Sequence, residues 1–348
     1  MTSKKRVIVV CPGRGSYNQE QLGYLNQHAG NQKEIVEQFD AWRKQRSEPT
    51  ITELDSAEKF QSRIHSVGEN ASPLIQVCAY VDYFSIDREK FDVVAITGNS
   101  MGWYLGLGVA GALNLERSFH LVQTMGSMMK DGLIGGQVLY PVVDSEWCAC
   151  PQKKADFDLA FSKASEDGEI FESIRLGGFI VVGGDEKALR SFMKHAPAID
   201  DRYPMKLMNH GAFHTPMLDS VSSTALSEFA EDFFSPPEIP LIDGRGKIWQ
   251  PYSTDPLELR DYTLGHQVVQ PFEYTSSIRV ALKEFAPDGI ILLGPGESLG
   301  APTAQVMIEN RWLGLTNKKQ FIDIQKKDPF VFSMGRPEQR DLVTGQMK

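Results

Sequence analysis

The sequence predicts an α/β fold with a parallel sheet in a large subdomain and a second, smaller subdomain inserted into it. Residues 6–11, 93–96 and 288–293 are short apolar runs of strand length, each followed by a glycine-containing turn. Continuous apolar runs of this kind are typical of strands that are buried on both faces in a parallel sheet. Residues 136–210 differ, because strand-like and helix-like segments alternate there in the order β-α-β-β-α-β.

These patterns set the expected boundaries. The large subdomain is expected to span residues 1–134 and 211–315, and a strand, a sharp turn and a helix at its centre make it α/β-hydrolase-like. Residues 135–210 are expected to form the ferredoxin-like (βαββαβ) subdomain. Residues 316–348 are rich in Lys, Gln and Asp, and we expect them to be a polar C-terminal tail that wraps loosely over the surface.

Each element is predicted from its own pattern. Residues 19–45 and 55–66 are polar and compatible with helix, whereas residues 72–86 carry apolar side chains at helical spacing and predict a core helix. Two more helices are expected at residues 103–113 and 116–130. Within the insertion, strands are expected at 137–143, 171–175, 178–182 and 205–208, and helices at 153–165 and 186–195.

Composition and charge exclude several classes of protein. The chain has 348 residues, 41% hydrophobic and 23% charged, as in ordinary globular proteins. A formal net charge of −9 argues against a general binder of nucleic acid or of anionic membranes. No apolar run reaches the length of a membrane span, and residues 7–11 are too short for the core of a signal peptide. Four cysteines without CxxC spacing predict neither a metal site nor a disulfide framework, so we expect a cytoplasmic protein without bound metal.

The most informative stretch runs from Gly98 to Gly102, where the sequence reads GNSMG. A G-x-S-x-G pattern between a strand and a helix is the nucleophile-elbow arrangement, in which a sharp turn presents the serine hydroxyl. The two glycines leave room for that turn, and the following helix directs its free N–H groups toward negative charge that forms beside the serine. The pattern favours Ser100 as a nucleophile over an ordinary buried turn serine.

A serine hydroxyl needs a base to take its proton, and histidine is the usual choice near neutral pH. His214 lies in the sequence GAFHTP, a turn-like segment just after the insertion. We therefore predict His214 as the base, with His210 and His266 as competitors.

Five motifs, in order, resemble those of the malonyl-CoA:acyl carrier protein transacylases and of the acyltransferase domains of polyketide synthases. Similarity to this family extends over residues 7–306. The motifs are PGRGSY at 12–17, GNSMGWY at 98–104 with AGAL at 110–113, GAFHTPML at 211–218, QVVQPFEY at 267–274 and LGPGESL at 293–299. Five motifs in the family's order are far more specific than any one of them.

The resemblance implies a role for each site residue. Ser100 is the implied nucleophile, His214 the general base, and Gln267 the residue that orients His214 through its side-chain oxygen. The backbone N–H groups of Met101 and Arg14 are the implied oxyanion hole, whose donors meet a charge that appears only in the tetrahedral intermediate. The substrate-binding residues implied by the same motifs are Arg14, Asn99, Met125 and Phe213.

Four residues depart from the family pattern. Arg14 replaces a Gln, Asn99 a His and Trp103 a Glu, while Met125 stands where the family has the Arg that holds the malonyl carboxylate. Two hypotheses follow. Either the pocket accepts an uncharged acyl group beside Met125, or the Arg14 guanidinium replaces the missing cation. The sequence favours the first, because a relocated arginine rarely reproduces a two-point grip on a carboxylate.

The implied reaction is ping-pong acyl transfer from acyl-CoA to the phosphopantetheine thiol of an acyl carrier protein on a separate chain, with no bound cofactor. Because such carriers are acidic, basic residues near the cleft are candidates for docking. Those nearest in sequence are Lys206, Arg202, Arg190 and Lys194. Two alternatives are hydrolysis of acyl thioesters at the same site and a non-catalytic homologue that binds carrier protein. The sequence leaves open whether the pathway makes fatty acids or polyketides.

Overall fold

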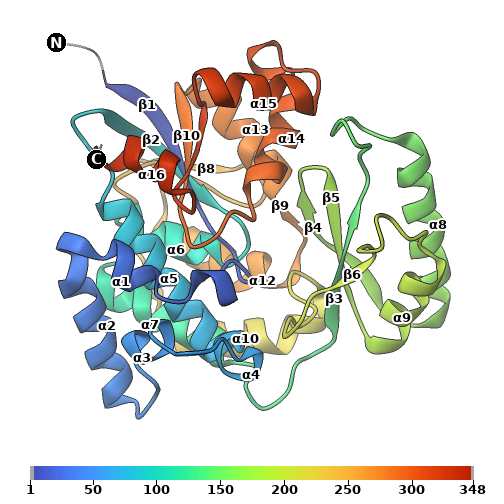
Figure 1. Ribbon diagram of the computed structural model, residues 1–348. Coiled ribbons are helices and arrows are strands. Elements are labelled where there is room, and N and C mark those ends of the chain that lie inside the picture. Colours follow the sequence, from blue (N-terminus) through green and yellow to red (C-terminus); the bar gives the residue numbers. More distant parts are fainter. Residues whose placement is uncertain (1–3, 346–348) are drawn as a thin grey trace.

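The computed structural model describes residues 4–345 and contains two sheets (Figure 1). The larger sheet has its strands in the order β11-β10-β1-β2-β7-β8, and all neighbours are parallel except β7 and β8. Its strands are β1 (Lys5–Cys11), β2 (Phe91–Gly98), β7 (Leu241–Ile242), β8 (Ile248–Trp249), β10 (Gly289–Leu292) and β11 (Val331–Ser333). The three apolar runs of the sequence thus become the three adjacent central strands, and most of their side chains are fully buried.

Helices cover both faces of this sheet. Figure 1 shows α1–α7 on one side and α13–α15 on the other, with α6 packed on β1 and β2. The longer helices of the large subdomain are α2 (Lys33–Gln45), α5 (Gly68–Phe84), α6 (Gly102–Val109), α7 (Leu115–Ser127), α10 (Asp219–Glu228), α13 (Tyr274–Phe285) and α14 (Gly300–Glu309). Shorter ones are α1 (Tyr24–His28), α3 (Ile51–Asp55), α4 (Ser62–His65), α11 (Pro256–Asp261) and α12 (Gln267–Val269). The expected helix at 19–45 is therefore divided into the short α1 and the longer α2, and 55–66 contains only the end of α3 and the short α4.

The core helix α5 begins four residues earlier than its apolar pattern predicted, although Pro73 lies inside it. A proline cannot donate to the carbonyl four residues before it, which here belongs to Glu69. Arg43 Nη1 and Gln123 Nε2 donate to that carbonyl instead, at 2.8 and 3.1 Å. The helix can pass through the proline because these two side chains satisfy the freed carbonyl.

The smaller sheet has the strand order β6-β3-β5-β4-β9. Its elements are β3 (Gly136–Pro141), α8 (Pro151–Asp167), β4 (Ile170–Leu176), β5 (Phe179–Gly184), α9 (Glu186–His195), β6 (Met205–Lys206) and β9 (Phe272–Glu273). The first six give the βαββαβ order, and α8 and α9 pack on the sheet around a hydrophobic core of their own. The predicted fold class, a large α/β subdomain with a small ferredoxin-like one, is confirmed.

One strand of the small sheet comes from outside the expected insertion. Strand β9 pairs in parallel with β4, so that Ile174 lies opposite Phe272. It precedes α13, which contacts strands of both sheets. We keep the subdomain boundaries as a proposal. With these boundaries, residues 211–315 of the large subdomain contribute β9 as an edge strand of the small sheet.

The C-terminal segment differs from the loose tail that its polar composition suggested. Its described part, residues 316–345, forms α15 (Lys318–Lys327), β11 and α16 (Pro337–Thr344), and β11 completes the edge of the large sheet beside β10. Arg340 on α16 is buried and donates to Asp82 Oδ1 at 2.5 Å and to the Tyr24 hydroxyl at 3.0 Å. Asp82 also accepts from the N–H of Gly294 at 2.7 Å. The composition misled because a few buried contacts, rather than overall polarity, hold this segment in place.

Replacing Arg340 with Met should lower the free energy of unfolding by about 3–5 kcal/mol, because it leaves the Asp82 carboxylate buried without its partner. Urea denaturation of the variant and the wild type measures the difference. Arg336→Met is the matched control, since Arg336 forms an exposed ion pair with Glu297 and should change stability by less than about 1 kcal/mol. Equal losses in the two variants would contradict this account of the C-terminal segment.

Candidate active site

The turn between β2 and α6 has the geometry of a nucleophile elbow. Ser100 has φ of 55°, a left-handed conformation that is uncommon for residues with a side chain. A methyl group on Gly98 would overlap with the backbone of Gly102, and one on Gly102 would overlap with the carbonyl of Cys11 on β1. The two glycines therefore allow the turn to close against the end of β1, and Ser100 projects from it.

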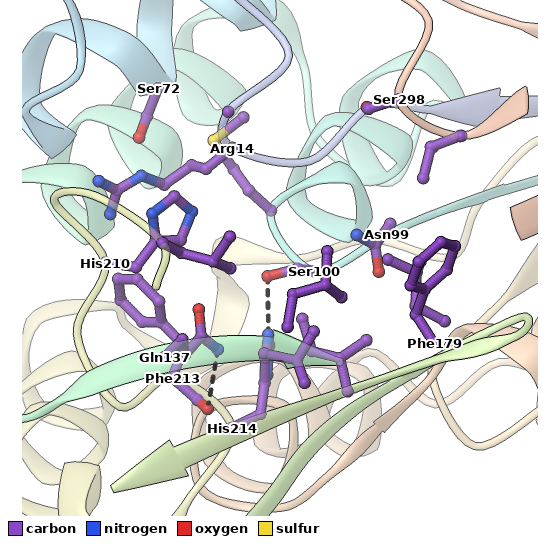
Figure 2. Close-up of a pocket in the computed structure, with 18 of the residues that line it drawn as sticks. Arg14, Ser72, Asn99, Ser100, Gln137, Phe179, His210, Phe213, His214 and Ser298 are labelled. Atoms are coloured by element: carbon purple, nitrogen blue, oxygen red, sulfur yellow. Dashed lines mark hydrogen bonds between the residues drawn. The ribbon is translucent and has the colours of Figure 1, made fainter. Parts of the chain in front are cut away.

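His214 contacts this serine directly. Its Nε2 lies 2.7 Å from Ser100 Oγ, and its Nδ1 lies 2.5 Å from the backbone carbonyl oxygen of Gln267 (Figure 2). Because a carbonyl can only accept, Nδ1 carries the proton and Nε2 is left to accept from the serine hydroxyl. Burial lowers the pKa of His214 to about 4, opposed by its hydrogen bond to Gln267. The ring is neutral at pH 7, the form in which it can take a proton.

Gln267 acts differently from the expectation. Its main-chain carbonyl, rather than its side-chain oxygen, accepts from His214. That carbonyl is free because α12 ends at Val269 and the residue four positions after Gln267 is Pro271, which has no N–H. The side chain instead accepts from the Tyr104 hydroxyl at 2.7 Å and donates to the carbonyl of Ser100 at 3.2 Å. It therefore joins the elbow to the segment that orients the histidine.

Two aromatic residues that follow the elbow serine also support this segment. Tyr104 binds Gln267, and the Trp103 indole N–H donates to Thr263 Oγ1 at 3.0 Å. Thr263 lies in a π-helical turn, η5 (Tyr262–His266), that leads directly into α12. From the sequence, Trp103 was noted only as a departure from the family pattern, and no role was predicted for Tyr104. Their positions three and four residues after Ser100, on the first turn of α6, were the available signal.

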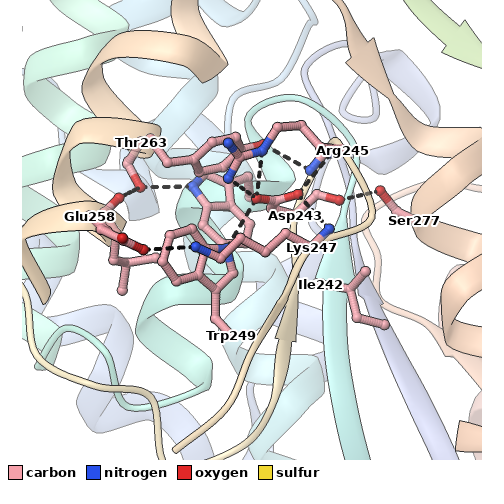
Figure 3. A network of polar contacts seen from close by, with 12 residues as sticks. Ile242, Asp243, Arg245, Lys247, Trp249, Glu258, Thr263 and Ser277 are labelled. Carbon is pink, nitrogen blue, oxygen red and sulfur yellow. Dashed lines mark hydrogen bonds and ion pairs between the residues drawn. The ribbon is translucent and has the colours of Figure 1, made fainter. Parts of the chain in front are cut away.

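A buried polar network anchors the other end of the π-helical turn (Figure 3). The Asp243 carboxylate is fully buried and accepts from the side chains of Arg245, at 2.6 Å, and Trp249, at 3.1 Å. The Arg245 guanidinium lies 4.1 Å above the ring of Tyr262, and the Tyr262 hydroxyl accepts from the N–H of Gly244. These contacts fix the segment that presents the Gln267 carbonyl to His214.

The backbone N–H groups of Met101 and Arg14 have no hydrogen-bond acceptor among the described residues 4–345. The loop of Arg14 lies against the elbow, since Asn99 N–H donates to the carbonyl of Cys11 at 3.2 Å, and a methyl group on Gly13 would come within 2.8 Å of the Asn99 carbonyl. Unpaired backbone donors at the start of a helix suit a developing negative charge.

Ser100 and His214 open into a cavity of about 460 Å³ between the large sheet's helices and the small sheet. The four residues predicted to bind substrate all line it. They are Arg14, Asn99, Met125 and Phe213. Most of the other lining side chains are apolar and come from α7, α10, β3–β5 and the start of α14 with the two residues before it. The cavity therefore suits a mainly apolar ligand with few polar contacts.

The competing histidines are placed elsewhere. His210 lines the cavity but donates from Nδ1 to the carbonyl of Met208 at 2.8 Å, and His266 stacks on Tyr262 with ring centres 5.6 Å apart. Within the described part of the chain, His214 is the histidine that bonds to Ser100. Residues 4–345 hold no cluster of three or more His, Cys, Asp or Glu side chains suited to a metal ion. No helix in the same range is long and apolar enough to cross a membrane.

The fold and the site together define an α/β protein with a serine–histidine pair at the end of a parallel sheet and a ferredoxin-like subdomain over it. Proteins of known name resemble this chain in sequence and in structure. The chain is 22% identical over 320 residues to the malonyl-CoA-acyl carrier protein transacylase of Salmonella typhimurium, covering 86% of this chain and 92% of that protein. No family model matches the chain.

Solved structures show the same architecture. An acyl-carrier-protein S-malonyltransferase from Burkholderia pseudomallei superposes with a TM-score of 0.73 at 17% identity, covering 98% of this chain and 99% of the other. A malonyl-transacylase solved in complex with a type II polyketide synthase acyl-carrier protein gives 0.71 at 15% identity, covering 99% and 100%. The relatives found by sequence and by structure are malonyl-CoA:acyl carrier protein transacylases, which agrees with the family that the five motifs resemble.

Proposed function

We propose that the protein is an acyl-CoA:acyl carrier protein S-acyltransferase that works through an acyl-enzyme on Ser100. The observation that carries this proposal is the 2.7 Å contact between Ser100 Oγ and the neutral, accepting Nε2 of His214. The names of its relatives support acyl transfer to a carrier protein. Acyl-CoA is the donor, phosphopantetheine of the carrier is the acceptor, and neither is a resident cofactor.

The first half-reaction forms the acyl-enzyme. His214 Nε2 takes the hydroxyl proton as Ser100 Oγ attacks the thioester carbonyl, and the carbonyl oxygen becomes an oxyanion. The N–H groups of Met101 and Arg14 stabilise that oxyanion. The carbon–sulfur bond then breaks, and the CoA sulfur leaves with the proton from His214. The Gln267 carbonyl keeps the imidazolium correctly oriented throughout.

The second half-reaction is the reverse with a new thiol. His214 takes the proton of the phosphopantetheine thiol, the sulfur attacks the acyl-serine, and Ser100 leaves with the proton. The carrier protein is a separate, acidic chain. Of the four candidate docking residues, Arg202 lines the cavity, whereas Lys206 and Arg190 are exposed and pair with Glu186. We therefore place the carrier at the Arg202 side of the small subdomain.

The acyl group itself depends on the residues around the cavity. Met125 of α7 lines it and offers a thioether where the family motif has a cation. A thioether cannot hold a carboxylate, and burying one beside it without another partner would be costly. The acyl group must therefore be uncharged unless a different residue supplies the positive charge.

Incubation of the protein with acyl-CoA and a carrier protein tests the proposal and its two rivals. We expect acyl-carrier to form at the rate at which CoA is released, and only with the phosphopantetheine-bearing form of the carrier. The carrier without phosphopantetheine is the control. Release of free acid instead of acyl-carrier would indicate a hydrolase. No CoA release from malonyl-, acetyl- or butyryl-CoA would contradict catalysis and favour a non-catalytic protein that binds the carrier.

A further inference from the structure

We infer that Arg14 and Ser72 form a carboxylate-binding site at the acyl end of the cavity, so that the transferred group is a carboxyacyl group. This inference rests on the proposed function of Ser100. It assigns to these two residues the selectivity that Met125 cannot provide. Figure 2 shows both side chains, with His210 and Phe213, at one end of the pocket and Ser100 toward its middle.

The Arg14 guanidinium is held in place on one side only. Its Nη2 donates to the backbone carbonyls of Asn209, at 2.5 Å, and Ser66, at 3.3 Å. The ring of Phe213 lies 5.2 Å from the guanidinium carbon. Its Nη1 and Nε have no hydrogen-bond acceptor among residues 4–345, and no carboxylate in that range lies within ion-pair distance of Arg14. A guanidinium fixed by two carbonyls and stacked on a ring is already oriented for a ligand.

This cation remains charged but has no counter-ion. Burial lowers the pKa of Arg14 to about 10, and the nearby charge of Glu69 opposes that shift. The neighbouring His210 is neutral, because burial and Arg14 together lower its pKa to about 4. A partly buried, charged guanidinium without an anionic partner is costly to the free protein, and a carboxylate on the ligand would remove that cost.

Ser72 provides a second, independent argument for a polar ligand group at the end of the cavity where Arg14 lies. Its side chain is only 2% exposed, lines the cavity and has no hydrogen-bond partner among the described residues. A hydroxyl that faces a cavity without a protein partner is available to bind a polar group of a ligand there. Ser72 provides one donor, and Arg14 provides two or three.

Both donors lie near Gly126 of α7, the residue that follows Met125. A methyl group on Gly126, the residue after Met125, would lie 3.0 Å from Ser72 Oγ. A methyl group on Gly68 would overlap with the carbonyl of Gly126 and lie 3.6 Å from Arg14 Nη1. Arg14, from the loop after β1, therefore carries its charge close to the part of α7 that follows Met125. The sequence favoured an uncharged acyl group, and this geometry favours the relocated cation.

Rates of Ser100 acylation with malonyl-CoA and acetyl-CoA test the inference, since the two donors differ only in the carboxylate. The wild type should prefer malonyl-CoA. Arg14→Gln keeps the backbone N–H but removes the charge, and should lower the malonyl-to-acetyl ratio of kcat/KM about 100-fold. Ser72→Ala should lower that ratio by about 3- to 10-fold. Met125→Arg added to Arg14→Gln should restore much of it.

Arg63→Gln is the matched control, because Arg63 is an exposed arginine on nearby α4 that does not line the cavity. Its ratio should stay within about twofold of the wild type. Equal or faster acylation of the wild type by acetyl-CoA would overturn the inference. So would an equal loss with both donors in Arg14→Gln, which would assign the Arg14 side chain to the CoA phosphates or to the positioning of its own loop. If no acyl-CoA acylates Ser100, the proposed function itself fails.

Discussion

Replacing Ser100 with Ala should lower the rate of acyl transfer by about 10⁴-fold or more. The variant keeps the cavity, the histidine and the two backbone donors, but it has no oxygen to accept the acyl group. A water molecule could still attack the thioester, but it would lack the orientation that the elbow gives to Ser100, so its attack would be slow. The measurement is kcat/KM for CoA release in the presence of the carrier protein.

Two controls separate loss of the nucleophile from loss of the fold. Urea unfolding should show that Ser100→Ala changes stability by no more than about 1–2 kcal/mol, since Ser100 is strained and makes one side-chain hydrogen bond. Ser220→Ala, at an exposed serine on α10 that does not line the cavity, should leave the rate unchanged. Transfer by Ser100→Ala within tenfold of the wild type would remove Ser100 from the mechanism.

Replacing His214 with Gln should lower the acylation rate by about 10³- to 10⁴-fold, because no other described histidine can take the proton of Ser100. Glutamine preserves much of the volume and can still donate to the Gln267 carbonyl, but it cannot act as a base near neutral pH. Stopped-flow measurement of CoA release gives the rate of the first half-reaction. His120→Gln, at a half-buried histidine on α7 that does not line the cavity, is the matched control and should keep the wild-type rate.

The same histidine predicts an unusual pH dependence. The reaction needs neutral His214, and burial lowers its pKa from about 6.5 to about 4. The acylation rate should therefore stay nearly constant from about pH 8 down to about pH 5 and fall to half near pH 4. An inflection near pH 6.5 in the wild type would show that the ring is exposed to water or is not the base.

The parts of the fold with strong local patterns could be predicted from the sequence. The apolar runs that became β1, β2 and β10 are buried on both faces, so nothing interrupts their pattern. The βαββαβ order was readable because each of its longer elements has its own apolar spacing. Strand β9 was not predicted, because its two residues, Phe272 and Glu273, form no pattern of their own. The C-terminal elements were missed because their stability depends on distant partners such as Asp82.

In the site, too, the features with a local sequence pattern could be predicted and those that depend on distant contacts could not. Ser100 could be predicted because Gly98 and Gly102 flank it closely in sequence, and His214 because of its turn-like setting, to which the five ordered motifs added support. What the sequence could not give is the direction of a side chain or the atom that makes a contact. Gln267 orients His214 through its backbone, for which Pro271 was the available but indirect signal. Arg14 was named as a candidate, yet only the fold shows that its charge reaches the wall beside Gly126.

The most direct test of the central claim, that Ser100 and His214 form a covalent acyl-enzyme, is the intact mass of the protein after brief mixing with malonyl-CoA in the absence of carrier. The account predicts a single acyl adduct, located on Ser100 by peptide mapping and lost when phosphopantetheinylated carrier is added. An unmodified protein that still transfers the acyl group, or an adduct on another residue, would contradict it.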